Sequence, residues 1–124
     1  MSAKLSAKQQ VQLAWLQTIP PKLDRLHRVI EQMAAMQADP VQVRGIQRVL
    51  DELKAQASTQ GVTGLSDTFG YMGMLLRRGG GHQLKVRGLR ELLVGARTNF
   101  EGALRQASTP EETAATDEPE PTSP

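Results

Sequence analysis

Apolar residues recur every three or four positions along most of this chain, in blocks separated by proline and glycine. This spacing places side chains on one face of an α-helix, whereas a half-buried strand would alternate apolar and polar residues. The four main blocks are Leu23, Leu26, Ile30, Met33 and Ala34; Val43, Ile46, Leu50, Leu53 and Ala57; Leu65, Phe69, Met72, Leu75 and Leu76; and Leu89, Leu92, Leu93, Ala96, Phe100 and Leu104. We therefore predict an all-α protein with four main helices.

Capping and breaking residues set the expected helix boundaries. A short leader helix is expected from about Ser6 to Thr18, and the second helix runs to about Gln37. The boundary signals are Pro20-Pro21, the N-cap pair Asp39-Pro40, Gly61, and Gly79-Gly80-Gly81. Connections this short favour antiparallel neighbours. The predicted fold is an up-and-down antiparallel four-helix bundle with a short N-terminal leader helix.

The charges divide the chain into two parts. All 15 Lys and Arg residues precede residue 108, while five of the 13 acids follow it, which leaves net charges of +7 and −5 on the two parts. The second part also holds four prolines and no large apolar residue, so it cannot offset the entropy of folding. We expect one helical domain over residues 1–107 and a disordered acidic, proline-rich tail over residues 108–124.

Several classes of site and location are disfavoured by composition. The chain has no cysteine, which excludes disulfides, thiolate zinc sites and cysteine nucleophiles. No apolar run approaches the roughly 20 residues of a membrane helix, and the polar N-terminus lacks the apolar stretch of a signal peptide. We expect a cytoplasmic protein that uses no metal, no cofactor and no membrane contact.

The segment from Leu50 to Gly61 resembles the histidine phosphotransfer (Hpt) family. That family's helix has a histidine, any residue, leucine, lysine, glycine, any residue and alanine, with a further glycine four residues on. Leu53, Lys54, Ala57 and Gly61 match in register, and the similarity covers roughly residues 13–106. The resemblance implies a helical bundle that docks on a response-regulator receiver domain or a histidine kinase.

Three departures from the family pattern bear on activity. Asp51 stands where the family carries its phosphoryl-accepting histidine, Ala55 replaces a glycine, and Gly73 falls where a glutamate is common. Phosphotransfer in this family needs a neutral imidazole nitrogen as nucleophile, which a carboxylate cannot replace. We therefore predict a pseudo-Hpt adaptor with no catalytic residue. A phosphotransferase would have to use His27, expected at the partly buried edge of its helix, or His82, expected near the start of the last helix.

The resemblance places partner binding on the exposed face of the third helix. The expected contact residues are Arg44, Arg48, Asp51, Lys54, Ala55 and Ser58. The small side chain of Ala55 would let a partner helix approach closely. A plain solvated face is the alternative interpretation, in which Asp51 pairs with Arg48 and Lys54 one turn away on the same helix.

Gly88, Gly95 and Gly102 recur every seven residues in the last helix, where each costs about 1 kcal/mol of helix propensity relative to alanine. Packing against a neighbouring helix explains such a groove beside Leu92. The alternative is a seat for a protein partner or a second copy of the chain, which makes a self-associating structural module the second functional hypothesis.

Nucleic-acid binding ranks below both hypotheses. A basic cluster does occur in sequence, made of Arg77, Arg78, Lys85, Arg87, Arg90 and Arg97. However, no recognition-helix motif accompanies it, exposed aromatic residues are almost absent, and the acidic tail could screen it. Gly79-Gly80-Gly81 is interpreted as a hairpin linker, because no phosphate-loop pattern accompanies it.

Overall fold

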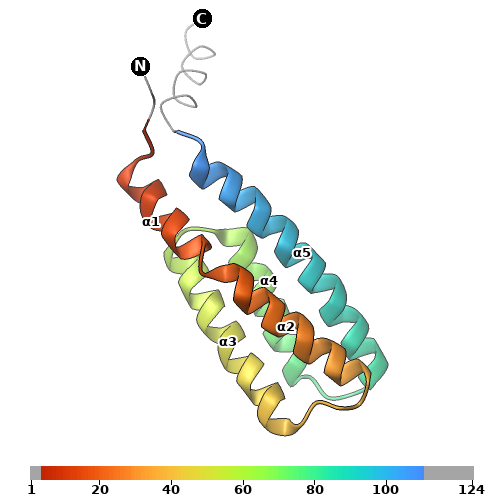
Figure 1. Cartoon of the computed structure of the whole chain (residues 1–124). Helices are drawn as coiled ribbons and strands as arrows, with labels where there is room; N and C mark the ends of the chain where they lie inside the picture. Colours follow the sequence, from red (N-terminus) through yellow and green to blue (C-terminus); the bar gives the residue numbers. More distant parts are fainter. Residues whose placement is uncertain (1–3, 111–124) are drawn as a thin grey trace, which may run out of the picture.

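The computed structural model describes residues 4–110, which form five helices and no strand (Figure 1). The helices are α1 (Ala7–Leu16), α2 (Ile19–Ala34), α3 (Pro40–Thr59), α4 (Thr63–Arg77) and α5 (His82–Ser108). The all-α prediction is confirmed. The predicted disorder of the tail concerns mainly residues 111–124, which lie outside the described residues.

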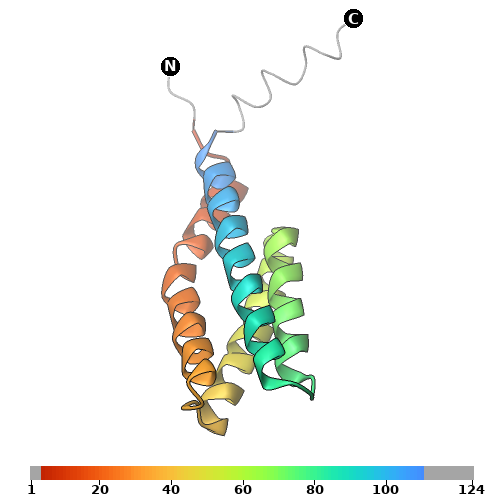
Figure 2. The same ribbon diagram turned by 90° about the vertical axis from the view of Figure 1, so that its right-hand side faces the viewer.

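Helices α2, α3, α4 and α5 pack against one another around one core. Each contacts the next in sequence, and α5 also contacts α2, so the four helices enclose a common interior. Figures 1 and 2 show that successive helices of this group run in opposite directions. Buried apolar side chains from all four helices fill the interior, among them Leu26, Leu50, Phe69 and Leu89.

Local capping explains where α3 begins and ends. The Asp39 side chain accepts a hydrogen bond from the Gln42 backbone N–H at 2.8 Å, and the Gln42 side chain accepts one from the Asp39 N–H at 2.9 Å. This capping box satisfies backbone donors that have no partner within the helix. The helix stops before Gly61, whose φ of +76° is a conformation that glycine adopts without strain. Both predicted boundaries are confirmed.

The leader helix ends two residues before its predicted end at Thr18, ahead of the prolines. Helix α1 stops at Leu16, and Pro20 and Pro21 lie in the first turn of α2, where proline costs no helical hydrogen bond. Helix α1 packs against the last turns of α5, where the buried Gln9 side chain donates to the Gln106 carbonyl at 3.0 Å. The long helix α5 therefore contacts both α1 and α2.

Two expectations about α2 were wrong. The helix ends at Ala34, three residues before Gln37, and Met36 beyond it has a positive φ of 59°. His27 is exposed instead of partly buried. Val29 is buried as well as Leu26 and Ile30, which turns the core-facing side of α2 away from His27. None of the five helices is long and apolar enough to cross a membrane within residues 4–110.

Candidate docking surface on helices α3 and α4

All six contact residues predicted on α3 are exposed. They lie on the side of α3 away from its buried residues Ile46, Leu50, Leu53 and Ala57. The exposed set is Arg44, Arg48, Asp51, Lys54, Ala55 and Ser58. The fold thus presents these residues to solvent on one helix face, next to α4.

Asp51 forms its ion pair with α4 and not along α3. The Arg77 guanidinium donates to the Asp51 carboxylate at 2.6 Å, and both side chains are about half exposed. Neither Arg48 nor Lys54 forms an ion pair with Asp51, so the alternative pairing along the helix was wrong. An exposed pair of this kind is worth up to about 1 kcal/mol.

Gly73 leaves the space that this ion pair occupies. A Cβ atom at Gly73 would lie 3.3 Å from an Arg77 guanidinium nitrogen and 3.8 Å from an Asp51 carboxylate oxygen. A glutamate here, as in the resembled family, would bring a second carboxylate towards Asp51. The positions of Asp51 and Gly73, two of the three departures from the family pattern, therefore adjoin in the fold.

Gly70 likewise leaves space for a side chain of α3, that of Lys54. A Cβ atom at Gly70 would lie 3.3 Å from Cε of Lys54, so the lysine side chain lies over the glycine. One turn earlier, the Ser66 hydroxyl donates to the Lys54 carbonyl at 3.2 Å. At the junction between α3 and α4, charged side chains of both helices therefore lie over these two glycines.

Two exposed apolar residues on α4 complete this surface, and sequence analysis missed them. The side chains of Tyr71 and Met74 are each 58% exposed. With Lys54, Ser66, Asp67 and Gly70 they line a depression of about 140 Å³. The sequence could have indicated their exposure, because neither residue falls at the three- or four-residue spacing of the buried stripe of Phe69, Met72 and Leu76.

We call this surface the α3–α4 face. It comprises Arg44, Arg48, Asp51, Lys54, Ala55 and Ser58 of α3 with Tyr71, Met74 and Arg77 of α4. It offers apolar contact area beside charged groups, which is the composition of a protein-binding surface. No group of three or more His, Cys, Asp or Glu side chains within residues 4–110 is placed to hold a metal ion.

The three glycines of α5 do not act as one groove. A Cβ atom at Gly88 would lie 2.6 Å from Cδ2 of Leu75, so this glycine allows close packing of α5 on α4. The same atom at Gly95 or Gly102 would have no neighbour within 4 Å. Intramolecular packing therefore explains Gly88 alone, and the other two positions are open.

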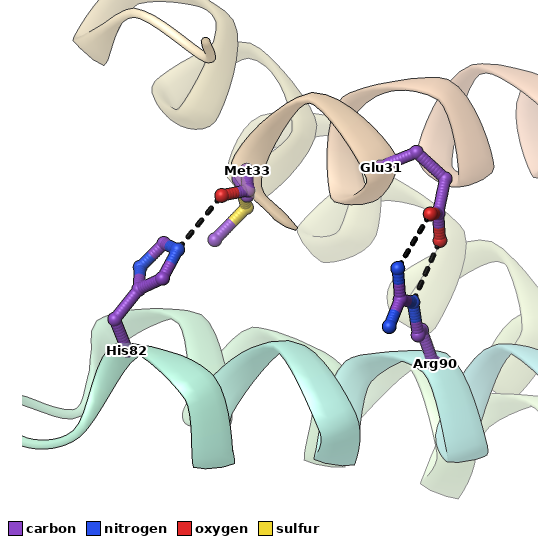
Figure 3. A network of polar contacts seen from close by, with 4 residues as sticks. All are labelled: Glu31, Met33, His82 and Arg90. Atoms are coloured by element: carbon purple, nitrogen blue, oxygen red, sulfur yellow. Dashed lines mark hydrogen bonds and ion pairs between the residues drawn. The ribbon is translucent and has the colours of Figure 1, made fainter. Parts of the chain in front are cut away.

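His82 and two cations of the predicted basic cluster join α5 to α2. Nε2 of His82 lies 2.7 Å from the Met33 carbonyl oxygen, and Arg90 pairs with both carboxylate oxygens of Glu31 (Figure 3). The hydrogen bond from Arg90 lowers the pKa of Glu31 below its usual value. Arg97 also joins α5 to α2, through a single contact of 3.3 Å with the Asp24 carboxylate. With Arg77 bound to Asp51, half of the six predicted cluster residues are held in ion pairs.

No protein family, curated protein or solved structure matches this chain.

Proposed function

We propose that the chain is a pseudo-Hpt adaptor of two-component signalling. Its four main helices form an antiparallel up-and-down bundle, and its α3–α4 face docks on a receiver domain or a histidine kinase in the cytoplasm. The adaptor regulates or localises that partner without transferring phosphate. The observation that carries the proposal is the exposure of Asp51 and Lys54, in register with the family motif, at the junction with α4.

Apolar and charged groups on this face favour a protein partner. Tyr71 and Met74 can bury large apolar areas against a partner, and aromatic residues are frequent binding hot spots. Arg44, Arg48 and Lys54 form no ion pair with any described residue. A receiver domain carries an acidic phospho-acceptor pocket, so these cations would be complementary to it and speed association.

The geometry at Asp51 disfavours phosphotransfer. The position holds a carboxylate engaged by Arg77 and no imidazole. A phosphorylated aspartate would need a divalent cation to offset its charge and further acids to hold that cation.

The proposal is tested by titrating purified receiver domains of the source organism against the protein by isothermal calorimetry. Replacing Ala55 by tryptophan should abolish binding, because the bulky ring would block close approach to the middle of the face. Ala14→Trp places the same ring on an exposed position of α1 and should leave the affinity unchanged. Receiver binding that survives Ala55→Trp, with both variants folded by circular dichroism, would contradict the proposed docking face.

The open positions at Gly95 and Gly102 support a second candidate function. A second copy of the chain, or an unrelated protein, could seat a helix against this part of α5, where the backbone is accessible. Sedimentation velocity then shows a dimer that Gly95→Leu dissociates, while Ala55→Trp has no effect. A monomer at all concentrations excludes self-association.

A further inference from the structure

Four arginines lie on the adjoining helices α2 and α3. They are Arg25 and Arg28 of α2 and Arg44 and Arg48 of α3, and all four are exposed. Arg77, Arg90 and Arg97 are held by carboxylates, whereas none of these four forms an ion pair with any residue from 4 to 110. We call this set the four-arginine patch.

A glycine brings the two halves of the patch together. The Arg25 guanidinium lies against α3 at Gly45, where an added Cβ atom would come within 2.9 Å of Nη2. Gly45 directly follows Arg44 and precedes Arg48 by one turn. The lack of a side chain at this position therefore lets an arginine of α2 reach the arginines of α3.

Like charges lie about one turn apart within each half of the patch. Arg25 and Arg28 are three residues apart, and Arg44 and Arg48 are four apart, so like charges face each other along both helices. Such pairs destabilise a helix when no anion offsets them. All four cations are arginine, whose planar guanidinium group binds carboxylates through two parallel hydrogen bonds.

Exposed aliphatic side chains adjoin the patch. Val41 lies one turn before Arg44 and is 68% exposed, and Met36 in the preceding connection is 76% exposed. A ligand that covers both the arginines and Val41 must carry acidic and apolar groups together. We infer that the four-arginine patch binds an acidic, partly apolar segment of a protein partner.

The surroundings favour this occupant over nucleic acid. Single-stranded nucleic acid binds through aromatic stacking, yet the aromatic residues lie on other helices: Trp15 on α1, Phe69 and Tyr71 on α4, and Phe100 on α5. The chain's own tail supplies five acids but no large apolar residue to cover Val41.

This inference does not rest on the proposed function. Arg44 and Arg48 also belong to the α3–α4 face, but Arg25 and Arg28 lie on α2, outside it. Substitutions on α2 therefore test the patch without touching the receiver-docking residues. Failure to bind any receiver domain would leave the result for the patch unchanged.

The test measures binding of a fluorescein-labelled peptide of repeating Glu-Leu-Glu-Glu units to the full chain by fluorescence anisotropy. The double variant Arg25→Glu and Arg28→Glu should weaken binding by about tenfold or more, and added salt should weaken the wild-type complex. The matched control is Arg87→Glu and Arg105→Glu on α5. It makes the same charge change at exposed arginines without described ion pairs, and should alter the affinity by no more than about twofold.

Four results would overturn the inference. Equal losses of peptide affinity in the two double variants would show that binding depends only on the net charge of the protein. Tighter binding of duplex DNA than of the peptide would identify a nucleic-acid surface. If changing all five tail acids to amides tightens peptide binding about tenfold, then the tail itself competes for the patch and is its occupant. Absence of peptide binding at low salt would remove the patch as a binding site.

Discussion

Alanine substitutions at the three α5 glycines should have different effects on stability, although the glycines are equivalent in the seven-residue pattern. At Gly95 an added methyl group meets no atom within 4 Å, so Gly95→Ala should raise the free energy of unfolding by the difference in helix propensity, about 1 kcal/mol. At Gly88 the methyl group would lie 2.6 Å from Cδ2 of Leu75. The leucine must leave its rotamer, which costs about 0.5–1.5 kcal/mol and offsets the gain. Gly88→Ala should therefore be close to neutral.

A double-mutant cycle isolates the role of Leu75. In a Leu75→Ala background the contact is gone, so Gly88→Ala should recover most of the stabilisation of about 1 kcal/mol. Urea unfolding followed by circular dichroism measures each free energy, and a change of this size also moves Tm by about 4–8 °C in a domain of this length. The packing of Gly88 on Leu75 would be refuted if Gly88→Ala and Gly95→Ala stabilise the protein equally in both backgrounds.

Three further perturbations follow from the described contacts. Asp39→Ala removes the cap of α3 and should cost about 1 kcal/mol in urea unfolding, whereas a loss below a few tenths would show that the capping box is not formed. The pKa of Glu31 is lowered in the folded state by Arg90, so its contribution to stability is present above pH 4.5 and is lost as pH falls through the folded pKa. Glu31→Gln should accordingly make Tm fall less steeply as the pH is lowered into mild acid. The same pH dependence of Tm in the wild type and the variant would contradict the pairing of Glu31 with Arg90. The double variant Asp51→His and Ala55→Gly should restore some phosphoryl acceptance from a matched phosphorylated receiver, detected as acid-labile label. Equal acceptance by the control variant Asp51→Gln and Ala55→Gly would point to another acceptor.

Local signals could be read from the sequence because their partners are close along the chain. Asp39 and Gln42 form a capping box three residues apart, and Gly61 ends a helix through its own backbone conformation. The face of α3 also followed from its periodicity, because the buried stripe fixes what remains exposed. These features depend on helix geometry alone.

Contacts between helices could not be read in the same way. Asp51 and Arg77 are 26 residues apart, and their pairing depends on the register of α3 against α4. Whether Gly88 or Gly95 is packed depends on where Leu75 lies, which no pattern within α5 reveals. The burial of His27 was mispredicted for a related reason, since one additional core residue, Val29, rotates the buried side of α2.

The most direct test of the proposed docking is to map the bound surface by NMR while a receiver domain is titrated into the isotope-labelled protein. Amide signals of Lys54, Ala55, Tyr71 and Met74 should shift or broaden together, while the amide signals of Gly95 and Gly102 on α5 stay in place. Saturating binding whose shifts centre on Gly95 and Gly102, with the α3–α4 face unchanged, would contradict the proposed docking.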